Sequence, residues 1–334
     1  MTTLPFNLDH PCYHDDEQAR VMFEAIYWPY GPSCPYCGKL DTVSENGGKK
    51  IMGPGWHWCS ECRQNFTVRV GTVLERSHIA LHKWMLGFRL YSASKRGFSA
   101  LQLQRMLNLG SYRSAWFMAH RIREAMDGSA DSDGPLGGPG KIVEVDEVFI
   151  GTSKPPMYQF VNGIGWIQVK RREQMKVMTL VERGGRARSL RMEDLTSDTA
   201  RAALVTNVSR KSILHTDEWR AYKGPGREFA DHESVNHAAK EYSRVGHEGR
   251  KVTTNTVEGF FSIFKRGMIG VYQHCSDKHL QRYLNEFDFR YSNRAKLGVD
   301  DTERTERAVK GATGRRLTYK QPSGRTNLPT EANP

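Results

Sequence analysis

Residues 141–151 read KIVEVDEVFIG, and this stretch decides the fold of the larger part of the chain. β-branched and other apolar residues dominate it, so it predicts a buried β-strand. Asp146 interrupts the centre of that strand. A carboxylate at the middle of a core strand is costly unless it is paired, protonated or bound to a metal. Asp146 is therefore a candidate functional residue.

Two later stretches place further acids beside apolar patterns. Residues 212–222, SILHTDEWRAY, are strand-like and put Asp217 just beyond the apolar run, at the end of a strand. Residues 255–267, NTVEGFFSIFKRG, predict a helix with Glu258 away from its apolar face. That apolar face comprises Val257, Phe260, Phe261 and Phe264, whereas Glu258 shares its face with Ser262 and Lys265.

The segments between these stretches indicate a mixed sheet. Residues 176–182 and 187–192 predict two more strands, and residues 198–208 predict a helix. The order is three strands, a helix, a strand and later a helix, which suits a mixed sheet flanked by helices. We therefore expect an α+β multidomain protein with this α/β domain as its larger part.

Asp146, Asp217 and Glu258 together suit a metal site. Three carboxylates from separate elements can hold two divalent cations about 3.5–4 Å apart, which is the arrangement used to cleave phosphodiesters. Mg²⁺ is the natural choice because it favours oxygen ligands. Ordinary explanations exist for each acid: Asp146 could pair with a buried arginine, and Asp217 could cap a turn. Asn255 and Glu258 have the spacing of a capping box, in which Glu258 would bond a backbone N–H.

Four of the six cysteines form two C-x-x-C pairs, Cys34 with Cys37 and Cys59 with Cys62, separated by 21 residues. Two such pairs supply four thiolates for tetrahedral zinc, and the residues between them form the strands of a zinc ribbon. A closed four-thiolate site leaves no position for substrate, so the zinc is expected to be structural. A redox dithiol is the competing interpretation, but it does not explain two pairs. His57 could replace a thiolate or serve in packing.

Residues 81–126 have the apolar spacing of three helices. The apolar positions are Trp84, Met85, Phe88 and Tyr91, then Leu101, Leu103 and Leu107, then Ala115, Trp116, Ala119 and Ile122. Ser99 and Ser111 are well placed as N-caps of the second and third helices. This is the form of a helix-turn-helix, although short helical bundles look the same. Its last helix would turn Tyr112, Arg113, His120 or Arg121 toward a DNA groove.

The composition limits the class of protein. The chain has 334 residues, with 49 Lys and Arg against 37 Asp and Glu, a formal charge of +12 and a pI near 9.4. Two or three domains are expected at this length, and the excess positive charge suggests nucleic acid as partner. No apolar run approaches the roughly 18 residues that cross a membrane, and the N-terminus lacks the pattern of a secretory signal. We expect a cytoplasmic protein without membrane contact.

Two stretches mark boundaries in the chain. Residues 127–140, DGSADSDGPLGGPG, predict a flexible linker. Residues 299–334 have too little apolar content to pack alone and predict a basic, disordered tail. From Arg250 to Pro334 there are 16 Lys and Arg and nine Asp and Glu, so more than half of the net charge lies in the last quarter of the chain.

Taken together, these motifs resemble one family. They are CPYCG (34–38), CSECRQNFTVRVGT (59–72), VEVDEVFIG (143–151), HTDEWRAY (215–222) and the long run NTVEGFFSIFKRGMIGVYQHCSDKHLQRYLNEFDFRYSNR (255–294). The chain resembles, from about residue 15 to about residue 298, the zinc-ribbon DDE transposases of bacterial insertion sequences, the ISXO-two-like group.

The resemblance implies a ribonuclease H-like catalytic domain at residues 141–298. Its acids would bind two Mg²⁺, or Mn²⁺, and carry out strand cleavage and strand transfer at the inverted-repeat ends of an insertion sequence. By position the triad falls on Asp146, Asp217 and Glu258. Part of this group uses Asn and Lys where the third acid is expected, which makes Asn255 the alternative third position and Lys265 an auxiliary residue. Glu258 is preferred because only it adds negative charge for a cation.

The resemblance also implies a zinc ribbon at residues 15–72 and a DNA-binding helix-turn-helix at residues 75–126. The partner would be double-stranded DNA, both element ends and target, bound by a homo-oligomer associated with the bacterial nucleoid. The expected DNA contacts are Arg113, Arg121, Lys265 and Arg266. His215, His237 and His247 lie near the motifs and could assist.

Two other functions fit the same residues. One is a non-catalytic zinc-ribbon and helix-turn-helix DNA-binding protein, such as a regulator or an inactive transposase. The other is a ribonuclease H-like nuclease that cuts DNA without joining it.

Overall fold

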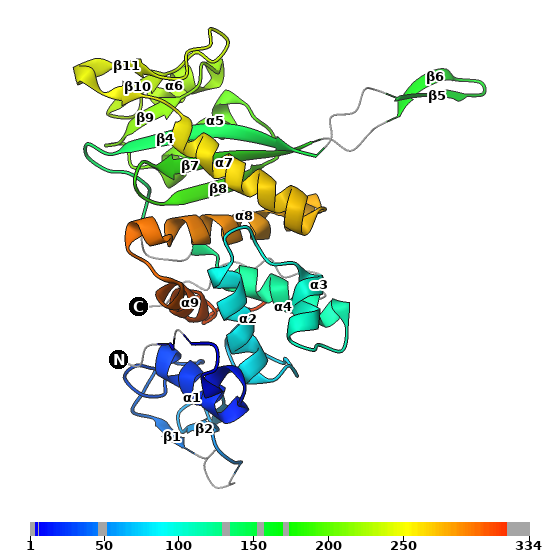
Figure 1. The fold of residues 1–334 in the computed structure, drawn as a ribbon, viewed down its shortest axis with the longest axis vertical. Coiled ribbons are helices and arrows are strands. Elements are labelled where there is room, and N and C mark those ends of the chain that lie inside the picture. The colour runs from blue at the N-terminus through cyan, green and yellow to red at the C-terminus, as the bar shows by residue number, and fades with distance from the viewer. Residues whose placement is uncertain are drawn as a thin grey trace. The chain divides into compact units, whose positions relative to one another are not determined.

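The computed structural model describes residues 4–5, 7–45, 52–128, 134–151, 157–169 and 174–318 (Figure 1). These residues divide into two units. The first is drawn from Met1–Phe88, Ala100–Ala125 and Glu306–Pro334, and the second from Arg89–Ser99 and Met126–Thr305. Within the described ranges, no helix combines the length and apolar character needed to span a lipid bilayer.

The first unit begins with a helix and a small sheet. A 3₁₀ turn at Pro11–Tyr13 precedes α1 (Asp16–Tyr27), whose N-cap Asp15 accepts a hydrogen bond from the backbone N–H of Gln18. Three short strands form an antiparallel sheet in chain order: β1 (Val43–Glu45), β2 (His57–Cys59) and β3 (Gln64–Phe66). The sheet joins the two cysteine pairs into one small domain, as the ribbon prediction requires.

Three helices follow, where the apolar spacing predicts them. They are α2 (Leu81–Ala93), α3 (Ala100–Met106) and α4 (Tyr112–Ala125). Ser111 caps α4, because its Oγ accepts a hydrogen bond of 3.1 Å from the Ser114 backbone N–H. Trp84, Met85, Phe88 and Tyr91 are fully buried. Leu101 lies outside the buried face, since α3 has only seven residues and buries Leu103 alone.

The prediction that His120 and Arg121 face outward is wrong. Both side chains are buried, and the Arg121 guanidinium lies 4.6 Å from the centre of the Phe117 ring. Arg121 is three residues beyond buried Met118 on α4, so the helical period carries it onto the buried side. Its burial lowers the pKa of the guanidinium. Arg113, near the start of α4, is exposed.

The second unit is built on a five-stranded mixed sheet. Its strands are β4 (Ile142–Ile150), β7 (Met175–Glu182), β8 (Ala187–Met192), β9 (Ile213–Thr216) and β10 (Asp231–Ser234). Their order in the sheet is β10-β9-β4-β7-β8. β4 is antiparallel to β7 and parallel to β9, and β9 is parallel to β10. The prediction of a mixed sheet flanked by helices is confirmed.

Helices cover both faces of this sheet (Figure 1). The long ones are α5 (Ser197–Asn207), α7 (Asn255–Gly267) and α8 (Asp277–Ser292). Val148 and Val177 pack with the phenylalanines of α7 and with α8, whereas Val143 and Val145 pack on the opposite face with α5. Shorter elements complete the unit: a 3₁₀ turn at Arg220–Tyr222, α6 (Lys223–Gly226), β11 (Arg244–Val245), a turn at His247–Gly249, β12 (Lys251–Val252), a π-helical turn at Met268–Tyr272 and a 3₁₀ turn at Ala295–Leu297.

Three regions differ from the predictions. An unpredicted hairpin, β5 (Met157–Val161) with β6 (Gly165–Val169), is inserted between β4 and β7. Residues 134–140 of the predicted linker are held in place: Leu136 is buried, and its N–H donates to the Asn207 carbonyl at 2.8 Å. Residues 129–133 of that linker lie outside the described residues.

The prediction of a disordered tail is wrong for residues 299–318. Helix α9 (Asp301–Lys310) forms there, and Ala308, Val309 and Ala312 are buried. The apolar content is too small to form an independent core, but it packs against the front of the chain, where Val73 N–H donates to the Ala312 carbonyl at 3.0 Å. Residues 319–334 lie outside the described residues.

Glu144 fastens α7 to the central strand. Its side chain is fully buried on β4, two residues before Asp146 and on the same face of the sheet. The carboxylate accepts hydrogen bonds from the backbone N–H groups of Thr256 (2.7 Å) and Val257 (3.1 Å), and from the Thr256 hydroxyl at 2.7 Å. Arg183 donates to it through Nε at 3.0 Å and Nη2 at 2.8 Å.

The Glu144 side chain thereby caps the N-terminus of α7, which the side chain of the helix's own N-cap residue does not do. Thr254, the N-cap of α7, makes no side-chain bond to the helix backbone. A carboxylate bound to free N–H groups at a helix N-terminus is also favoured by the helix dipole. Because Glu144 and Asp146 share one strand, this contact determines how far the first turn of α7, and Glu258 on it, lies from Asp146.

Replacing Glu144 with Gln should destabilise the second unit by about 2–4 kcal/mol. The side-chain NH₂ of Gln would face groups that themselves donate hydrogen bonds to Glu144, and the Arg183 charge would lose its partner. Urea denaturation followed by circular dichroism measures the loss. Thr256→Val removes only the hydroxyl contact and should cost about 1 kcal/mol. Glu248→Gln, at a well-exposed acid, is the control. A Glu144→Gln midpoint equal to that of the control would contradict the anchoring role.

Candidate active site and zinc site

Asp146 and Asp217 come together because β4 and β9 run parallel side by side. The register pairs Ile142 with Ile213 and Glu144 with His215, and continuing it by two residues brings Asp146 on β4 level with Asp217, the residue directly after β9. Asp146, Glu147 and Asp217 each bring a carboxylate oxygen to within 4.8 Å of the others. The acids predicted from separate parts of the sequence therefore meet at one place on the sheet.

The simpler explanations for these acids, that Asp217 caps a turn and that Asp146 pairs with a buried arginine, apply only in part. Asp217 does cap a turn, since its Oδ1 accepts a hydrogen bond of 3.0 Å from the Trp219 N–H. Asp146 Oδ1 accepts from the Glu147 N–H at 2.8 Å, and no arginine of the described ranges forms an ion pair with it. A buried arginine therefore does not explain Asp146.

Glu258 lies on the first turn of α7. Glu258 is the fourth residue of the helix, which begins at Asn255. Because the N-cap is Thr254 and not Asn255, the predicted capping box between Asn255 and Glu258 is not formed. Instead Glu258 Oε1 accepts a hydrogen bond of 2.9 Å from the Thr254 hydroxyl and lies 3.5 Å from His237 Nε2. Glu258 lies outside the 4.8 Å group, but its charge raises the pKa of Asp146. Asn255, the alternative third position, is exposed on the first turn of α7.

The carboxyls of this site are hard to ionise together. Burial, followed by the charges of Asp217 and Glu258, raises the pKa of Asp146 from its ordinary 3.8 to about 6. Burial and the charges of Asp217 and Asp146 raise the pKa of Glu147 from 4.5 to about 8, and burial raises that of Asp217. Such a cluster of buried like charges is stable when ionised only if positive charge is supplied.

Glu147 was not among the predicted site residues. It follows Asp146 on β4, so its side chain leaves the opposite face of the strand, where the Tyr222 hydroxyl donates to it. The signal was present in the sequence as a second acid next to Asp146 inside an apolar strand. Its carboxylate nevertheless comes within 4.8 Å of those of Asp146 and Asp217, so Glu147 belongs to the same acidic group.

The three histidines have different surroundings. His237 Nε2 lies 3.1 Å from the Thr254 hydroxyl, and its charge lowers the pKa of both Asp146 and Asp217. His215 is fully buried, and burial followed by the Arg183 charge lowers its pKa to about 4, so it is neutral. His247 lies apart from the site.

A second group of possible ligands surrounds His247. Asp231, Glu233 and His247 approach within 4.8 Å, but the two acids are already paired with arginines. Arg250 lies 2.5 Å from Asp231, and Arg244 lies 3.1 Å from Glu233. This group is therefore a structural ion-pair network.

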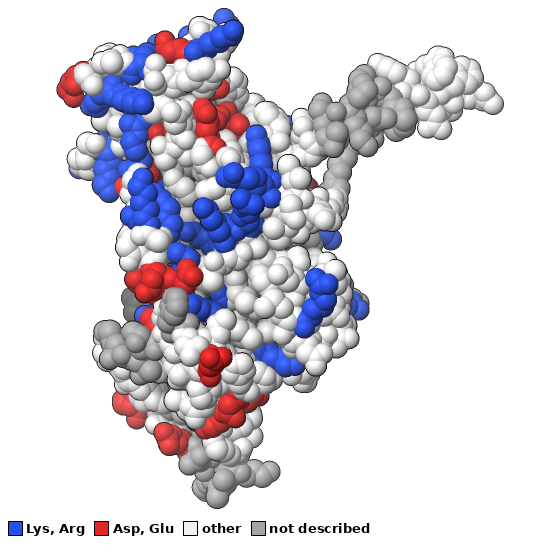
Figure 2. Space-filling view, in the orientation of Figure 1, with Lys and Arg blue, Asp and Glu red and all other residues white. Residues whose placement is uncertain are grey.

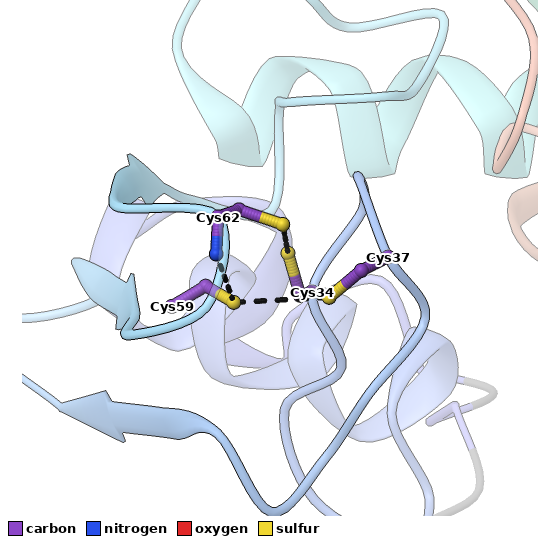
Figure 3. Close-up of side chains that lie close together, drawn as sticks. All are labelled: Cys34, Cys37, Cys59 and Cys62. Atoms are coloured by element: carbon purple, nitrogen blue, oxygen red, sulfur yellow. Dashed lines mark hydrogen bonds between the residues drawn. The ribbon is translucent and has the colours of Figure 1, made fainter.

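The four paired cysteines converge on one point in the first unit (Figure 3). The Sγ atoms of Cys34 and Cys62, and those of Cys37 and Cys59, are 3.8 Å apart. A tetrahedral zinc site with Zn–S distances of about 2.3 Å has sulfur atoms about 3.8 Å apart, so the geometry fits zinc. Backbone N–H groups also approach the sulfurs, as in Cys62 N–H to Cys59 Sγ at 3.4 Å.

His57 is not part of this cluster. It is buried between Trp28 and Phe66, with ring centres 5.1 and 5.4 Å away, and its Nε2 lies 3.4 Å from Glu24. The packing interpretation of His57 is therefore the correct one. The two remaining cysteines, Cys12 and Cys275, are buried separately.

Two family models match these two parts of the chain. Residues 135–292 match the ISXO2-like transposase domain, and residues 14–65 match the transposase zinc-ribbon domain. The chain belongs to the zinc-ribbon transposases of the ISXO2-like group. A protein of Halobacterium salinarum, described as an uncharacterized protein in transposable element ISH50, is 26% identical over 283 residues, which cover 82% of this transposase and 90% of that protein.

Two solved structures are similar to this chain, with low TM-scores. The Drosophila P element transposase strand transfer complex has 10% identity and a TM-score of 0.26, with 68% of this transposase and 62% of that chain covered. The pre-cleavage Mos1 transpososome has 13% identity and a TM-score of 0.18, with coverages of 70% and 80%. The chain thus spans less than two thirds of the P element protein.

Neutralising Asp146 should stabilise the transposase when no divalent cation occupies the acidic site. Its raised pKa means that the native state holds the proton more tightly than the unfolded chain, so stability falls as the pH rises from about 4 to about 6 and stays lower above. Asp146→Asn removes this loss and should gain about 1–3 kcal/mol at pH 8 and nothing near pH 4. Urea denaturation at both pH values tests this, with the exposed acid changed in Glu193→Gln as control. A gain of equal size at both pH values would refute the electrostatic cause.

Removing one zinc ligand should empty the ribbon of metal. Cys37→Ser leaves three thiolates, so bound zinc should fall from one per chain to nearly none, and the ribbon should lose its order because its core is small. Zinc content after gel filtration and the near-ultraviolet circular dichroism of the ribbon tryptophans measure both effects. Cys275→Ala, which removes a thiol elsewhere, should keep its zinc. Full zinc content in Cys37→Ser would show that Cys37 is not a ligand.

Proposed function

We propose that this transposase cuts and joins DNA strands at the ends of an insertion sequence, with Asp146, Asp217 and Glu258 as its catalytic acids. The observation that carries the proposal is the meeting of Asp146 and Asp217 on adjacent parallel strands, with Glu258 presented to them by α7. No basic side chain of the described ranges neutralises Asp146 or Asp217 through an ion pair, although both are half-buried.

The donor set suits hard divalent cations. Only carboxylate oxygens converge there, which fits Mg²⁺ or Mn²⁺ and not a thiol-seeking metal. Bound cations would supply charge stabilisation at the phosphodiester and lower the pKa of an attacking hydroxyl. The raised pKa values of Asp146 and Asp217 support this assignment, because mutual repulsion without cations is the expected property of a site made to bind them.

Each acid has a distinct task in this proposal. Asp146 and Asp217 would together hold the cation site on the sheet, and Glu258 would complete it from the helix. Thr254 and His237 hold the Glu258 carboxylate through contacts of 2.9 and 3.5 Å. Glu258 is preferred to Asn255 because its charge already acts on Asp146.

The remaining parts of the chain would bring DNA to this site. The zinc ribbon and the helices α2–α4 would bind the inverted repeats, with exposed Arg113 as a phosphate or base contact. Lys265 and Arg266 on α7 would contact the backbone near the acids. Synapsis of two element ends requires more than one copy, so we include a homo-oligomer in the proposal.

A strand-transfer assay tests the proposal. Duplexes carrying the terminal inverted repeats, read from the DNA that flanks the gene, are incubated with Mg²⁺ and a target plasmid. Asp146→Ala, Asp217→Ala and Glu258→Gln should each lower cleavage and joining by roughly 10³-fold or more, since each loses a ligand of the reacting centre. Asn255→Ala and Glu248→Gln should remain active.

The outcomes separate the alternatives. Binding without any Mg²⁺-dependent cleavage by the wild type would identify a DNA-binding protein without catalysis. Cleavage without joined product would identify a nuclease. Near-normal joining by Glu258→Gln together with loss in Asn255→Ala would move the third position to Asn255.

A further inference from the structure

Gly259 has no role in packing its own helix. It lies inside α7, directly after Glu258, and a Cβ placed on it would meet no atom within 4 Å. Its φ is not in the left-handed region either. Glycine weakens a helix relative to alanine, so the fold alone gives no reason for it. Close approach of another molecule's backbone is the remaining physical reason for a missing side chain.

Gly259 is part of an exposed polar stripe along α7. Asn255, Gly259, Ser262 and Arg266 follow one another at helical spacing and are all exposed. Glu258 begins this surface, and Lys265, two turns later, lies on nearly the same side of the helix. At a rise of about 1.5 Å per residue, the seven steps from Glu258 to Lys265 cover about 11 Å.

A second segment adds positive charge at the far end of α7. A Cβ on Gly267 would lie 2.6 Å from the Arg96 carbonyl oxygen, so glycine allows residues 94–98 to approach the helix. The Phe98 N–H donates to the Tyr272 hydroxyl at 3.1 Å, and Phe98 is buried. This anchoring holds Lys95 and Arg96 against the end of α7.

Lys95, Arg96, Lys265 and Arg266 together form what we call the α7 cation cluster. All four are exposed, and none forms an ion pair with any residue in the described part of the chain. Figure 2 shows Lys and Arg side chains gathered over the region of α7 and α8, beside a smaller group of acidic side chains. Four uncompensated cations held at one place indicate an anionic ligand.

We propose that one DNA strand runs along α7, from the acids over Gly259 and Ser262 to the α7 cation cluster. This inference rests on the proposed function and adds the path of the strand and two contacts, Lys95 and Arg96, from the connection between α2 and α3. At about 3.4 Å per nucleotide along a strand, the cluster binds phosphates about three nucleotides from the reacting one. Gly259 and Ser262 leave room for the sugar-phosphate backbone between the two.

Charge removal tests the cluster. In the full chain with Asp146→Asn, so that DNA stays uncut, the affinity for an inverted-repeat duplex is measured by fluorescence anisotropy at several salt concentrations. Lys95→Ala/Arg96→Ala should reduce the slope of log K against log salt by about 1.8, or 0.9 for each lost phosphate contact. Arg210→Ala/Lys211→Ala, which removes the same charge just before β9, at the opposite end of that strand from Asp217, should leave the slope nearly unchanged. Equal slopes in the two double variants would overturn the proposal.

Side-chain addition at Gly259 tests the path. Gly259→Ala should raise the melting temperature by about 2 °C, because alanine favours the helix and meets nothing in the protein. Gly259→Leu should fold with a melting temperature at or above that of the wild type, yet bind the duplex at least about tenfold more weakly and cleave it correspondingly slowly. Wild-type binding and cleavage by folded Gly259→Leu would overturn the path while leaving the proposed function intact. Failure of the unsubstituted chain to bind or cut DNA would overturn both.

Discussion

The contact between Glu144 and the first turn of α7 is the constraint on which the arrangement of the acids depends. It is a buried carboxylate on the central strand, bonded at once to two helix N–H groups, a hydroxyl and an arginine. A helix packed only through apolar side chains could slide or rotate by a fraction of a turn at little cost, because such contacts are not directional. Hydrogen bonds to a charged group are directional. They therefore fix the position of Glu258 relative to Asp146, which hydrophobic packing alone would leave loose.

Strand β4 also carries acidic side chains whose burial destabilises the folded state. Val143, Val145 and Val148 give β4 its core contacts, while Asp146 and Glu147 introduce carboxyls whose burial raises their pKa. Glu144 is compensated by Arg183 and the helix N-terminus, but Asp146 has no such partner in the described part of the chain. Buried Glu144 and half-buried Asp146, two carboxylates on one strand, thus differ in whether a positive charge compensates them. Glu144 holds α7 to the strand, whereas Asp146 has no ion pair with an arginine of the described residues, as its proposed role in binding a cation requires.

The sequence predicted much of this, and its failures have physical causes. The strand at 141–151, Asp146 within it and the helix at 255–267 followed from periodicity, which local patterns encode directly. The meeting of Asp146 with Asp217 depends on the parallel pairing of β4 and β9, which no local pattern contains. Arg121 was misjudged because a charged side chain was taken as exposed, whereas it stacks on Phe117 in the buried side of α4. Helix α9 was missed because its few apolar residues are buried in a fold that includes distant parts of the chain, as the bond from the Val73 N–H to the Ala312 carbonyl shows.

The α7 cation cluster gives four of the 49 Lys and Arg residues behind the net charge of +12 a place beside the acids. A group of carboxylates repels phosphates, so a DNA strand that reaches it as we propose has to be held by cations that do not neutralise the acids themselves. Separation along a helix meets this requirement. At about 11 Å along the helix from Glu258, Lys265 is beyond direct pairing and farther away than the Debye length of about 8 Å at physiological salt, yet on the proposed path it would contact phosphates of the same strand. Helix α7 therefore joins the contact with Glu144, the proposed catalytic acid Glu258 and two of the cations in one element, so that a shift of its first turn would displace all of them together.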